Sequence, residues 1–147
     1  MGDLAKMQGG DPTLALRHSK CLSADVNAAM DPTFQDVMER KNASFLNYGV
    51  VVTKYTGARG KSSTSDASAE YVAEVRALLD RENIVWQMGE MGKVDIGGGG
   101  TVAMFVANMG VDVVDLGVPV LSMHAPFETT AKFDVYMCYR AMYEFMK

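Results

Sequence analysis

Short β-branched runs alternate with amphipathic helical stretches along the chain. The clearest strand is Gly49–Tyr55, a run of valines that ends shortly before Gly57. A helix is predicted further on, with Ser65 or Asp66 as its N-cap and its end near Asn83. Its apolar positions recur at i, i+1, i+4, i+7 and i+8, which places them on one stripe. They are Tyr71, Val72, Val75, Leu78 and Leu79.

The rest of the pattern predicts further short elements. The predicted strands are Cys21–Val26, Ile84–Met88, Val111–Leu116 and Pro119–Met123. Helices are predicted at Thr13–His18 and Thr101–Asn108, with a last one that starts after Thr129 or Thr130. One face of this last helix carries Phe133, Met137, Ala141 and Phe145. Strands that alternate with helices indicate an α/β layered sandwich, in which a central mixed, largely parallel sheet is flanked by helices.

Two polar segments are predicted to be loops. Gly57–Ser65 is expected to be flexible and basic, with Arg59 and Lys61 in solvent. Gly89–Gly100 ends in four consecutive glycines ahead of a helix, and amides at a helix N-terminus can bind anions. A nucleotide-binding domain is therefore one open alternative. The sequence contains neither G-x-x-x-x-G-K-S/T nor a G-x-G-x-x-G motif after a strand.

Composition narrows the class of protein. The chain has 147 residues, the length of one ordinary domain, with 48% hydrophobic and 22% charged residues, which excludes disorder. No apolar run approaches the roughly 20 residues of a membrane helix, and the N-terminus carries no signal-peptide core. The net charge of −4 gives no electrostatic basis for nucleic-acid binding. The cysteines Cys21 and Cys138 fit free thiols in a reducing compartment, so we expect a cytoplasmic protein.

Four polar residues in or beside the predicted strands are candidates for chemistry. His124 follows an apolar strand, and ligands bind at strand ends in α/β sheets. The alternative is a structural, hydrogen-bonded histidine. Asp25 is similarly placed, with a turn or cap residue as the alternative. Lys54 is either a solvated edge residue or a charge directed into a site. Asp115 is expected to be an exposed or salt-bridged edge residue.

Several separated segments, in order, resemble the M18 family of metallo-aminopeptidases, the aspartyl aminopeptidase and aminopeptidase I group. They are SADVNAAMDP (Ser23–Pro32), GGGGTVA (Gly97–Ala103), VDLGVPVLSMHAPFE (Val114–Glu128) and the tail AKFDVYMCYRAMYEF. The bacterial aminopeptidase I type is the most similar. The resemblance begins near Ser19, so residues 1–18 are interpreted as a lead-in and 19–147 as the C-terminal segment of the family's peptidase domain.

The resemblance implies roles for individual residues. The family's peptidase domain holds two adjacent divalent metal ions, usually zinc, with manganese or cobalt as alternatives. Asp25 in the S-x-D motif and His124 in the M-H motif match metal ligands of the family. The implied substrate-binding residues are Lys54, Gly99, Gly100 and Thr101. The sequence departs from the family pattern at Ala28, Gly98 and Ala125, which bears on pocket shape and specificity.

Other residues of the family's active site have no counterpart here. The H-x-D motif, the bridging aspartate and the Glu-Glu pair with the general base all precede S-x-D, and neither H-x-D nor Glu-Glu occurs in the sequence. We therefore expect the C-terminal portion of an aminopeptidase that removes N-terminal residues from peptides through a metal-activated water. It is expected to be inactive alone and part of a homo-oligomer when intact. The alternative is a non-catalytic binding or assembly module that retains the fold.

Overall fold

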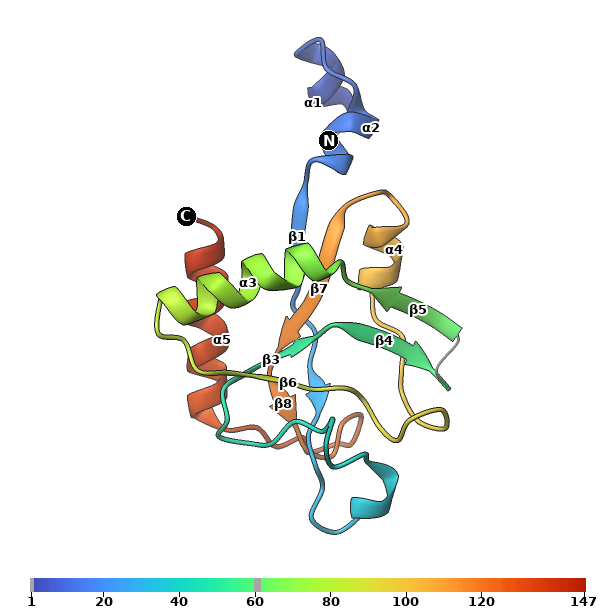
Figure 1. The fold of residues 1–147 in the computed structure, drawn as a ribbon, viewed down its shortest axis with the longest axis vertical. Coiled ribbons are helices and arrows are strands. Elements are labelled where there is room, and N and C mark those ends of the chain that lie inside the picture. The colour runs from blue at the N-terminus through green and yellow to red at the C-terminus, as the bar shows by residue number, and fades with distance from the viewer. Residues whose placement is uncertain (1, 60–61) are drawn as a thin grey trace.

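The valine run forms the centre of a four-stranded sheet. The structure is a computed structural model that describes residues 2–59 and 62–147. The strand order is β1 (Lys20–Ser23), β7 (Asp112–Gly117), β3 (Val50–Thr53) and β6 (Trp86–Met88). β1 runs parallel to β7 and β3 parallel to β6, whereas β3 and β7 are antiparallel. The predicted mixed, largely parallel sheet is confirmed (Figure 1).

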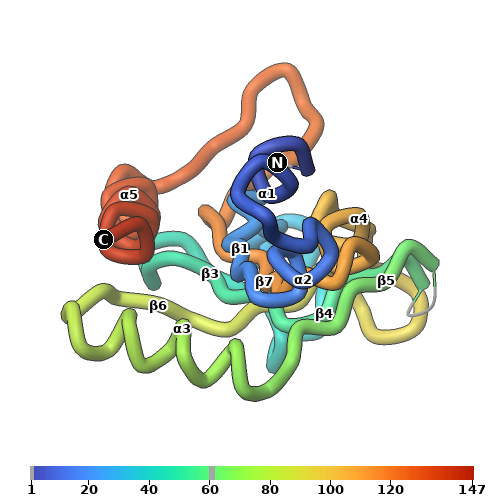
Figure 2. Tube along the Cα trace, turned by 90° about the horizontal axis from the view of Figure 1, so that it is seen from above, coloured from blue at the N-terminus to red at the C-terminus, as the bar shows by residue number. Residues whose placement is uncertain are grey.

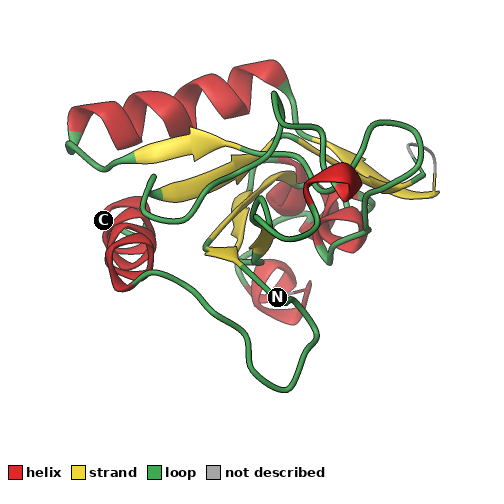
Figure 3. Ribbon diagram, turned by 90° about the horizontal axis from the view of Figure 1, so that it is seen from below, coloured by secondary structure: helices red, strands yellow, loops and turns green. Residues whose placement is uncertain are grey.

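α3 (Ala69–Arg81) and α5 (Lys132–Phe145) lie beside this sheet in Figures 2 and 3, and both supply residues to the core cluster that contains Val50 and Val52. Val50 and Val52 alternate onto one packing surface, and neither is exposed. The apolar stripe of α3 is buried as predicted, apart from Leu78, which is half-buried. The core cluster consists of Val50, Val52, Ala67, Tyr71, Val72, Val75, Leu79, Ile84, Val114, Leu116, Met137 and Ala141.

The segment predicted as a flexible loop is a β-hairpin. β4 (Tyr55–Ala58) pairs antiparallel with β5 (Ser62–Asp66), and Thr56 opposite Ser65 is buried. Small hydroxyl side chains can line a buried ladder, so the polar composition misled the prediction. Lys61 lies outside the described residues. The N-cap of α3 is Ser68, whose hydroxyl accepts from the amide of Tyr71 at 3.2 Å, rather than Ser65 or Asp66.

The remaining elements are short. The helices are α1 (Gly2–Met7), α2 (Pro12–Arg17), a single 3₁₀ turn at Gln35–Val37 and α4 (Ala103–Ala107). The predicted strand at Pro119–Met123 shrinks to β8 (Pro119–Val120), which pairs in parallel with β2 (Asn27–Ala28). In the described part of the chain, no helix is long and apolar enough to cross a membrane.

The C-terminal helix is fixed by polar contacts at both ends. Its N-cap is Ala131, with no side-chain cap, instead of Thr129 or Thr130. Asp134 is fully buried and accepts from the amides of Asn47 and Gly49, both at 2.8 Å. Phe133, predicted for the buried face, is exposed instead.

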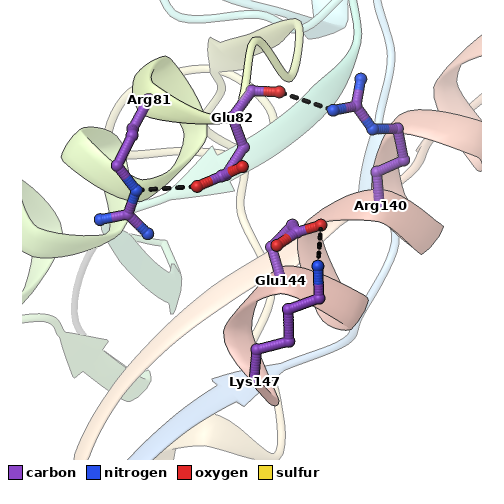
Figure 4. Close-up of polar contacts among 5 residues, drawn as sticks. All are labelled: Arg81, Glu82, Arg140, Glu144 and Lys147. Atoms are coloured by element: carbon purple, nitrogen blue, oxygen red, sulfur yellow. Dashed lines mark hydrogen bonds and ion pairs between the residues drawn. The ribbon is translucent and has the colours of Figure 1, made fainter.

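At the other end of this helix, Arg140 binds the end of α3. Its guanidinium donates to the carbonyl oxygen of Glu82 at 2.6 Å (Figure 4). It also donates to the carbonyl oxygen of Asn83 at 3.3 Å. The last carbonyls of a helix have no partner within the helix, so Arg140 supplies donors to the end of α3. The contact joins two helices that lie far apart in the sequence.

Candidate functional site

Asp25 lies in the connection between β1 and β2, where the chain passes against the end of β7. Its carboxylate accepts from the amide of Val26 at 2.8 Å, and its own amide donates to the carbonyl of Ser23 at 2.9 Å. A Cβ on Gly117 would stand 1.4 Å from the carbonyl oxygen of Asp25. Glycine is therefore required at position 117, and the backbone of Asp25 is held by contact with β7.

His124 lies in the turn that follows β8. Its φ of 68° is in the left-handed region, which a non-glycine residue adopts at a cost. The backbone amide of His124 donates to the carboxylate of Glu128 at 2.6 Å, which helps to hold this turn. The side chain is exposed, and no hydrogen bond of its imidazole to a described residue is seen.

β2 and β8 bring the segments of these two residues to neighbouring strands. Asn27 pairs with Pro119 and Ala28 with Val120, so Asp25 precedes one strand and His124 follows the other. Carboxylate and imidazole are donors that zinc takes, but a zinc site needs three or four protein ligands. Among the described residues no group of three or more His, Cys, Asp or Glu side chains is placed to hold a metal. These residues therefore do not complete a zinc site by themselves.

Asp115 is not the edge residue expected from the sequence. β7 lies between β1 and β3, and Asp115 pairs with Ser23 on one side and Thr53 on the other. It is 5% exposed. Burial raises the pKa of its carboxyl, and the negative charge of Asp25 adds to this shift.

The hydroxyl of Thr101 donates to Asp115 at 2.8 Å. Thr101, a predicted substrate-binding residue, is itself buried, so its hydroxyl points to the interior of the sheet. Asp115 thus connects the end of the glycine-rich segment to the strand that leads to Asp25. One Asp115 oxygen and the Ser23 hydroxyl have no hydrogen-bond partner among the described residues.

A cavity of about 290 Å³ lies between β4 and the glycine-rich loop. Its wall is formed by Asn42, residues 55–57 of β4 and residues 90–95 and 97–99 of the loop. Gly99 is part of this wall. Gly100 packs against Ser63 instead, where a Cβ would come within 2.7 Å of the Ser63 Cβ. Of the predicted substrate-binding residues, the structure places Gly99 directly at the cavity.

Close backbone packing accounts for the glycines of this loop. Gly98 has a φ of +99°, and a Cβ there would lie 2.1 Å from the carbonyl oxygen of Gly57. A Cβ on Gly97 would lie 2.5 Å from the amide nitrogen of Lys93. The amide of Arg59 donates to the carbonyl of Gly97 at 2.8 Å. The glycine run thus lets the loop lie against β4, and it needs no bound phosphate to explain it.

Lys54 is the charged residue at the bend between β3 and β4. Its ammonium forms an ion pair with Asp66 of β5, so it is a paired residue and not simply a solvated one. Glu90, which lines the cavity, lies within electrostatic range of both residues. Burial raises the pKa of Glu90 to about 7, against the opposing effects of a hydrogen bond from the Tyr55 backbone and of Lys54.

Sequence reasoning missed Glu90, Asp66 and the burial of Asp115. A charged residue two positions after the predicted strand Ile84–Met88 was the available signal for Glu90. Asp66 could be linked to Lys54 only once the hairpin register was known, because the two residues are twelve positions apart.

The mixed sheet, with a carboxylate and an imidazole beside the neighbouring strands β2 and β8, is compatible with an α/β metallopeptidase domain. The family model described as "Aminopeptidase I zinc metalloprotease (M18)" matches residues 4–146. The chain belongs to this family, and the resemblance noted from its motifs is confirmed.

Curated relatives are similar over most of the chain. A "Probable M18 family aminopeptidase 1" from Clostridium acetobutylicum is 52% identical over 122 residues, which is 83% of this chain and 26% of the relative. The protein of the same name from Thermotoga maritima is 46% identical over 96% of this chain and 33% of its own length. The chain thus spans about a quarter to a third of the length of these relatives.

Solved structures support the same fold. A crystal structure of an M18-family aminopeptidase from Thermotoga maritima superposes with a TM-score of 0.90 at 46% identity, covering 97% of this chain and 33% of that one. Aminopeptidase I from Clostridium acetobutylicum gives a TM-score of 0.89 at 46% identity, covering 96% of this chain and 31% of that one. The mApe1 dodecamer of S. cerevisiae, at 24% identity and a TM-score of 0.73, shares the fold over 93% of this chain and 28% of that one.

Proposed function

We propose that the chain supplies two metal ligands and part of the substrate pocket of a zinc aminopeptidase that removes N-terminal residues from peptides. Asp25 and His124 are the proposed ligands. Lys54, Gly99, Gly100 and Thr101 are the proposed substrate-binding residues, with Thr101 acting from behind the pocket. The observation that carries the proposal is the family match over residues 4–146, which includes both ligand motifs.

The residues of this chain have separate tasks in the proposed reaction. Metal ions bound in the intact enzyme would act as Lewis acids toward a water molecule and the peptide carbonyl, and Asp25 and His124 would each supply a ligand to them. Asp25 is oriented by its contacts with Val26 and Gly117, and His124 is presented by its left-handed turn. Gly99 has no side chain, so the substrate can approach the backbone of the loop there. Further metal ligands and a glutamate base are required, and the motifs that would provide them are absent from this sequence.

The first test is aminopeptidase activity. We expect the purified 147-residue chain to hydrolyse no aminoacyl-nitroanilide in the presence of zinc, manganese or cobalt. Clear turnover that His124→Ala abolishes would contradict the proposal that the chain is inactive alone.

The second test is metal binding, because it does not depend on turnover. Two ligands should hold zinc only weakly, so equilibrium dialysis should show a dissociation constant in the micromolar range or above. Asp25→Asn and His124→Ala should each weaken this binding. His18→Ala is the matched control, since His18 caps the end of α2 and belongs to no proposed site. Equal binding by all these variants would contradict the ligand assignment.

We also propose that the intact enzyme is a homo-oligomer. The mApe1 dodecamer, which shares the fold at 24% identity, motivates this proposal. Gel filtration with light scattering on the chain tests the alternative of an assembly module. A defined oligomer formed without metal or substrate would favour that alternative.

A further inference from the structure

The loop that carries His124 is fixed at its base but extends away from the sheet. Figure 2 shows the chain between β8 and α5 leaving the body of the molecule before it returns to α5. At the base, the amide of Leu121 donates to the carbonyl of Thr129 at 2.9 Å, and the amide of Thr129 donates back to the carbonyl of Leu121 at 3.1 Å. The shape of residues 122–128 therefore depends on contacts within the loop itself.

The tip of this loop combines two costly backbone conformations with a stiff segment. Ser122 has a φ of 58° and His124 a φ of 68°, so two residues that are not glycine adopt the left-handed region. The amide of Ala125 donates to the carbonyl of Ser122 at 2.9 Å. Pro126 has a fixed φ and restricts the residue before it. The short connection from His124 to Glu128 is therefore stiff, which lowers the entropy lost when its two ends are joined.

Glu128 joins the two ends of this connection. Its carboxylate accepts from the backbone amide of His124 at 2.6 Å, a short hydrogen bond of the strong, charge-assisted kind. Among the residues that the structure describes, it is the one side-chain hydrogen bond seen within residues 122–128. Because the amide belongs to His124 itself, the bond fixes the peptide plane that enters its Cα atom. It thereby sets the direction in which the imidazole leaves the backbone.

Glu128 also lies at a groove shared with the segment of Asp25. The groove has a volume of about 310 Å³ and is lined by Glu128, Val26, three further valines and Thr130. Val26 follows Asp25 in the chain, and its amide donates to the Asp25 carboxylate at 2.8 Å. The contacts that orient the two proposed ligands thus meet at one groove.

From these contacts we propose that Glu128 is the positioning residue of His124: its carboxylate holds the left-handed backbone of His124 and so directs the imidazole, without binding the metal. The inference rests on the proposed function, in which His124 is a metal ligand. It assigns the role to the acceptor oxygen of Glu128 and not to its negative charge. Glutamine, which keeps an acceptor oxygen on a side chain of the same length, should therefore replace Glu128, and alanine should not.

The test uses the full 147-residue chain, with zinc as the probe. Equilibrium dialysis measures the zinc affinity, and NMR on the ¹⁵N-labelled, metal-free chain reports the amide of His124. Glu128→Ala should weaken zinc binding about tenfold, as expected for loss of a group that orients a ligand. It should also move the His124 amide signal upfield, because the amide loses its acceptor. Glu128→Gln should bind zinc within about twofold of the wild-type chain and keep most of the downfield shift.

The matched control is Glu74→Ala. Glu74 is an exposed glutamate of the same charge that is paired with Lys20 instead. Its removal should leave both the zinc affinity and the His124 amide signal unchanged. The dispersion of the amide spectrum checks that each variant is folded. Rescue by glutamine is the decisive comparison, because Glu128→Gln and Glu128→Ala lose the same charge and differ in the acceptor.

The outcomes separate this inference from the proposed function. If Glu128→Ala binds zinc as tightly as the wild-type chain while His124→Ala binds it more weakly, the inference is overturned and the ligand assignment stands. The inference is also overturned if Glu128→Gln loses as much affinity as Glu128→Ala, or if the His124 amide signal does not move in Glu128→Ala. If His124→Ala leaves zinc binding unchanged, the ligand assignment falls and the inference falls with it.

Discussion

Two regions of the molecule are held together by different interactions. One is the core on the α3 and α5 side of the sheet, and the other surrounds β2, β4 and the glycine-rich loop. On the side of α3 and α5, apolar side chains such as Val50, Leu79 and Leu116 are fully buried against one another. Around β2, β4 and the glycine-rich loop, the contacts are between backbone and polar groups. Ser44 donates to Asn27 at 2.7 Å, and Asn27 donates to Thr53 at 2.9 Å.

This difference means that the region that contributes most to stability is not the region that holds the candidate site. The apolar half tolerates changes of shape in proportion to the volume lost, because side chains can relax into a gap. The polar half is fixed by close backbone approach, where one added carbon cannot be accommodated. All the proposed site residues lie in the second half. Four substitutions test this contrast, from the largest expected effect to the smallest.

Gly117→Ala should have the largest effect. The new Cβ would stand 1.4 Å from the carbonyl oxygen of Asp25, so the β1–β2 connection must move away from β7. We expect a loss of more than about 4 kcal/mol in the free energy of unfolding, or no folded protein. Urea denaturation measures the change. Gly99→Ala is the control, because its nearest neighbour would be a methionine methyl at 3.7 Å. A Gly117→Ala protein as stable as this control would contradict the close approach.

Leu79→Ala tests the apolar half. It should lower the free energy of unfolding strongly, but the variant should still fold. Leu79 is fully buried in the core cluster, and truncation there costs roughly 2–5 kcal/mol. Leu78 lies next to it on the same helix and is half-buried, so Leu78→Ala should cost clearly less. The two variants can be compared by chemical denaturation. Equal losses would mean that the packing of α3 differs from the structure.

Asp134→Ala should have an intermediate effect. It removes the acceptor for two amides, and leaving buried donors without partners costs about 2–3 kcal/mol. Asp134→Asn keeps one acceptor oxygen and should lose about half as much. Thermal denaturation measures both changes. Asp112→Asn, at an exposed position of β7, is the control and should be nearly neutral. Similar melting temperatures for Asp134→Ala and the control would contradict the role of Asp134 as acceptor for the amides of Asn47 and Gly49.

Glu90→Gln should have the smallest effect, visible mainly as a pH dependence. The pKa of Glu90 is raised to about 7 from 4.5, so the folded chain binds the proton more tightly than the unfolded chain. Stability from this group is present below pH 4.5 and is lost as pH rises through 7. With discounting for its partial exposure, the loss is about 1 kcal/mol.

Glu90→Gln removes this titration. The variant should therefore gain stability relative to the wild-type chain between pH 5 and pH 8, and melting curves at both pH values measure the difference. The groups that interact with the Glu90 carboxylate are Lys54, Asp66 and the Tyr55 backbone. A constant difference at both pH values would show that Glu90 has an ordinary pKa.

Hydrophobic periodicity predicted the apolar half well. The β3 valines and the stripe of α3 are continuous in sequence, and burial of apolar side chains dominates their local structure. The hairpin was missed because its buried positions are Thr56 and Ser65, residue types that also fill loops. The start of α5 was predicted at Thr129 or Thr130, one or two residues too early, because its actual N-cap, Ala131, has no side-chain cap to mark it in the sequence.

Positions at strand ends marked Asp25 and His124 as candidates, but only the family motifs gave these two residues the role of metal ligands. Nothing in the spacing of Asp25 and His124 indicates that β2 and β8 pair in parallel. The burial of Asp115 depends on the order of strands in the sheet, since β7 is inserted between β1 and β3. The pairing of Lys54 with Asp66 depends on the hairpin register. These features depend on contacts between segments that are distant in the sequence, so the local pattern of one sequence does not predict them.

The hydrogen bonds from Arg140 to the end of α3 have a consequence for local unfolding of the molecule. With Asp134 fastening the other end of α5, this helix joins the last turn of α3 to the segment that enters β3. Such a bridge makes the three segments one cooperative unit in native-state hydrogen exchange. We expect the amides of Asn47 and Gly49 and those of the last turn of α3 to share one opening free energy, and Arg140→Ala to split it into two.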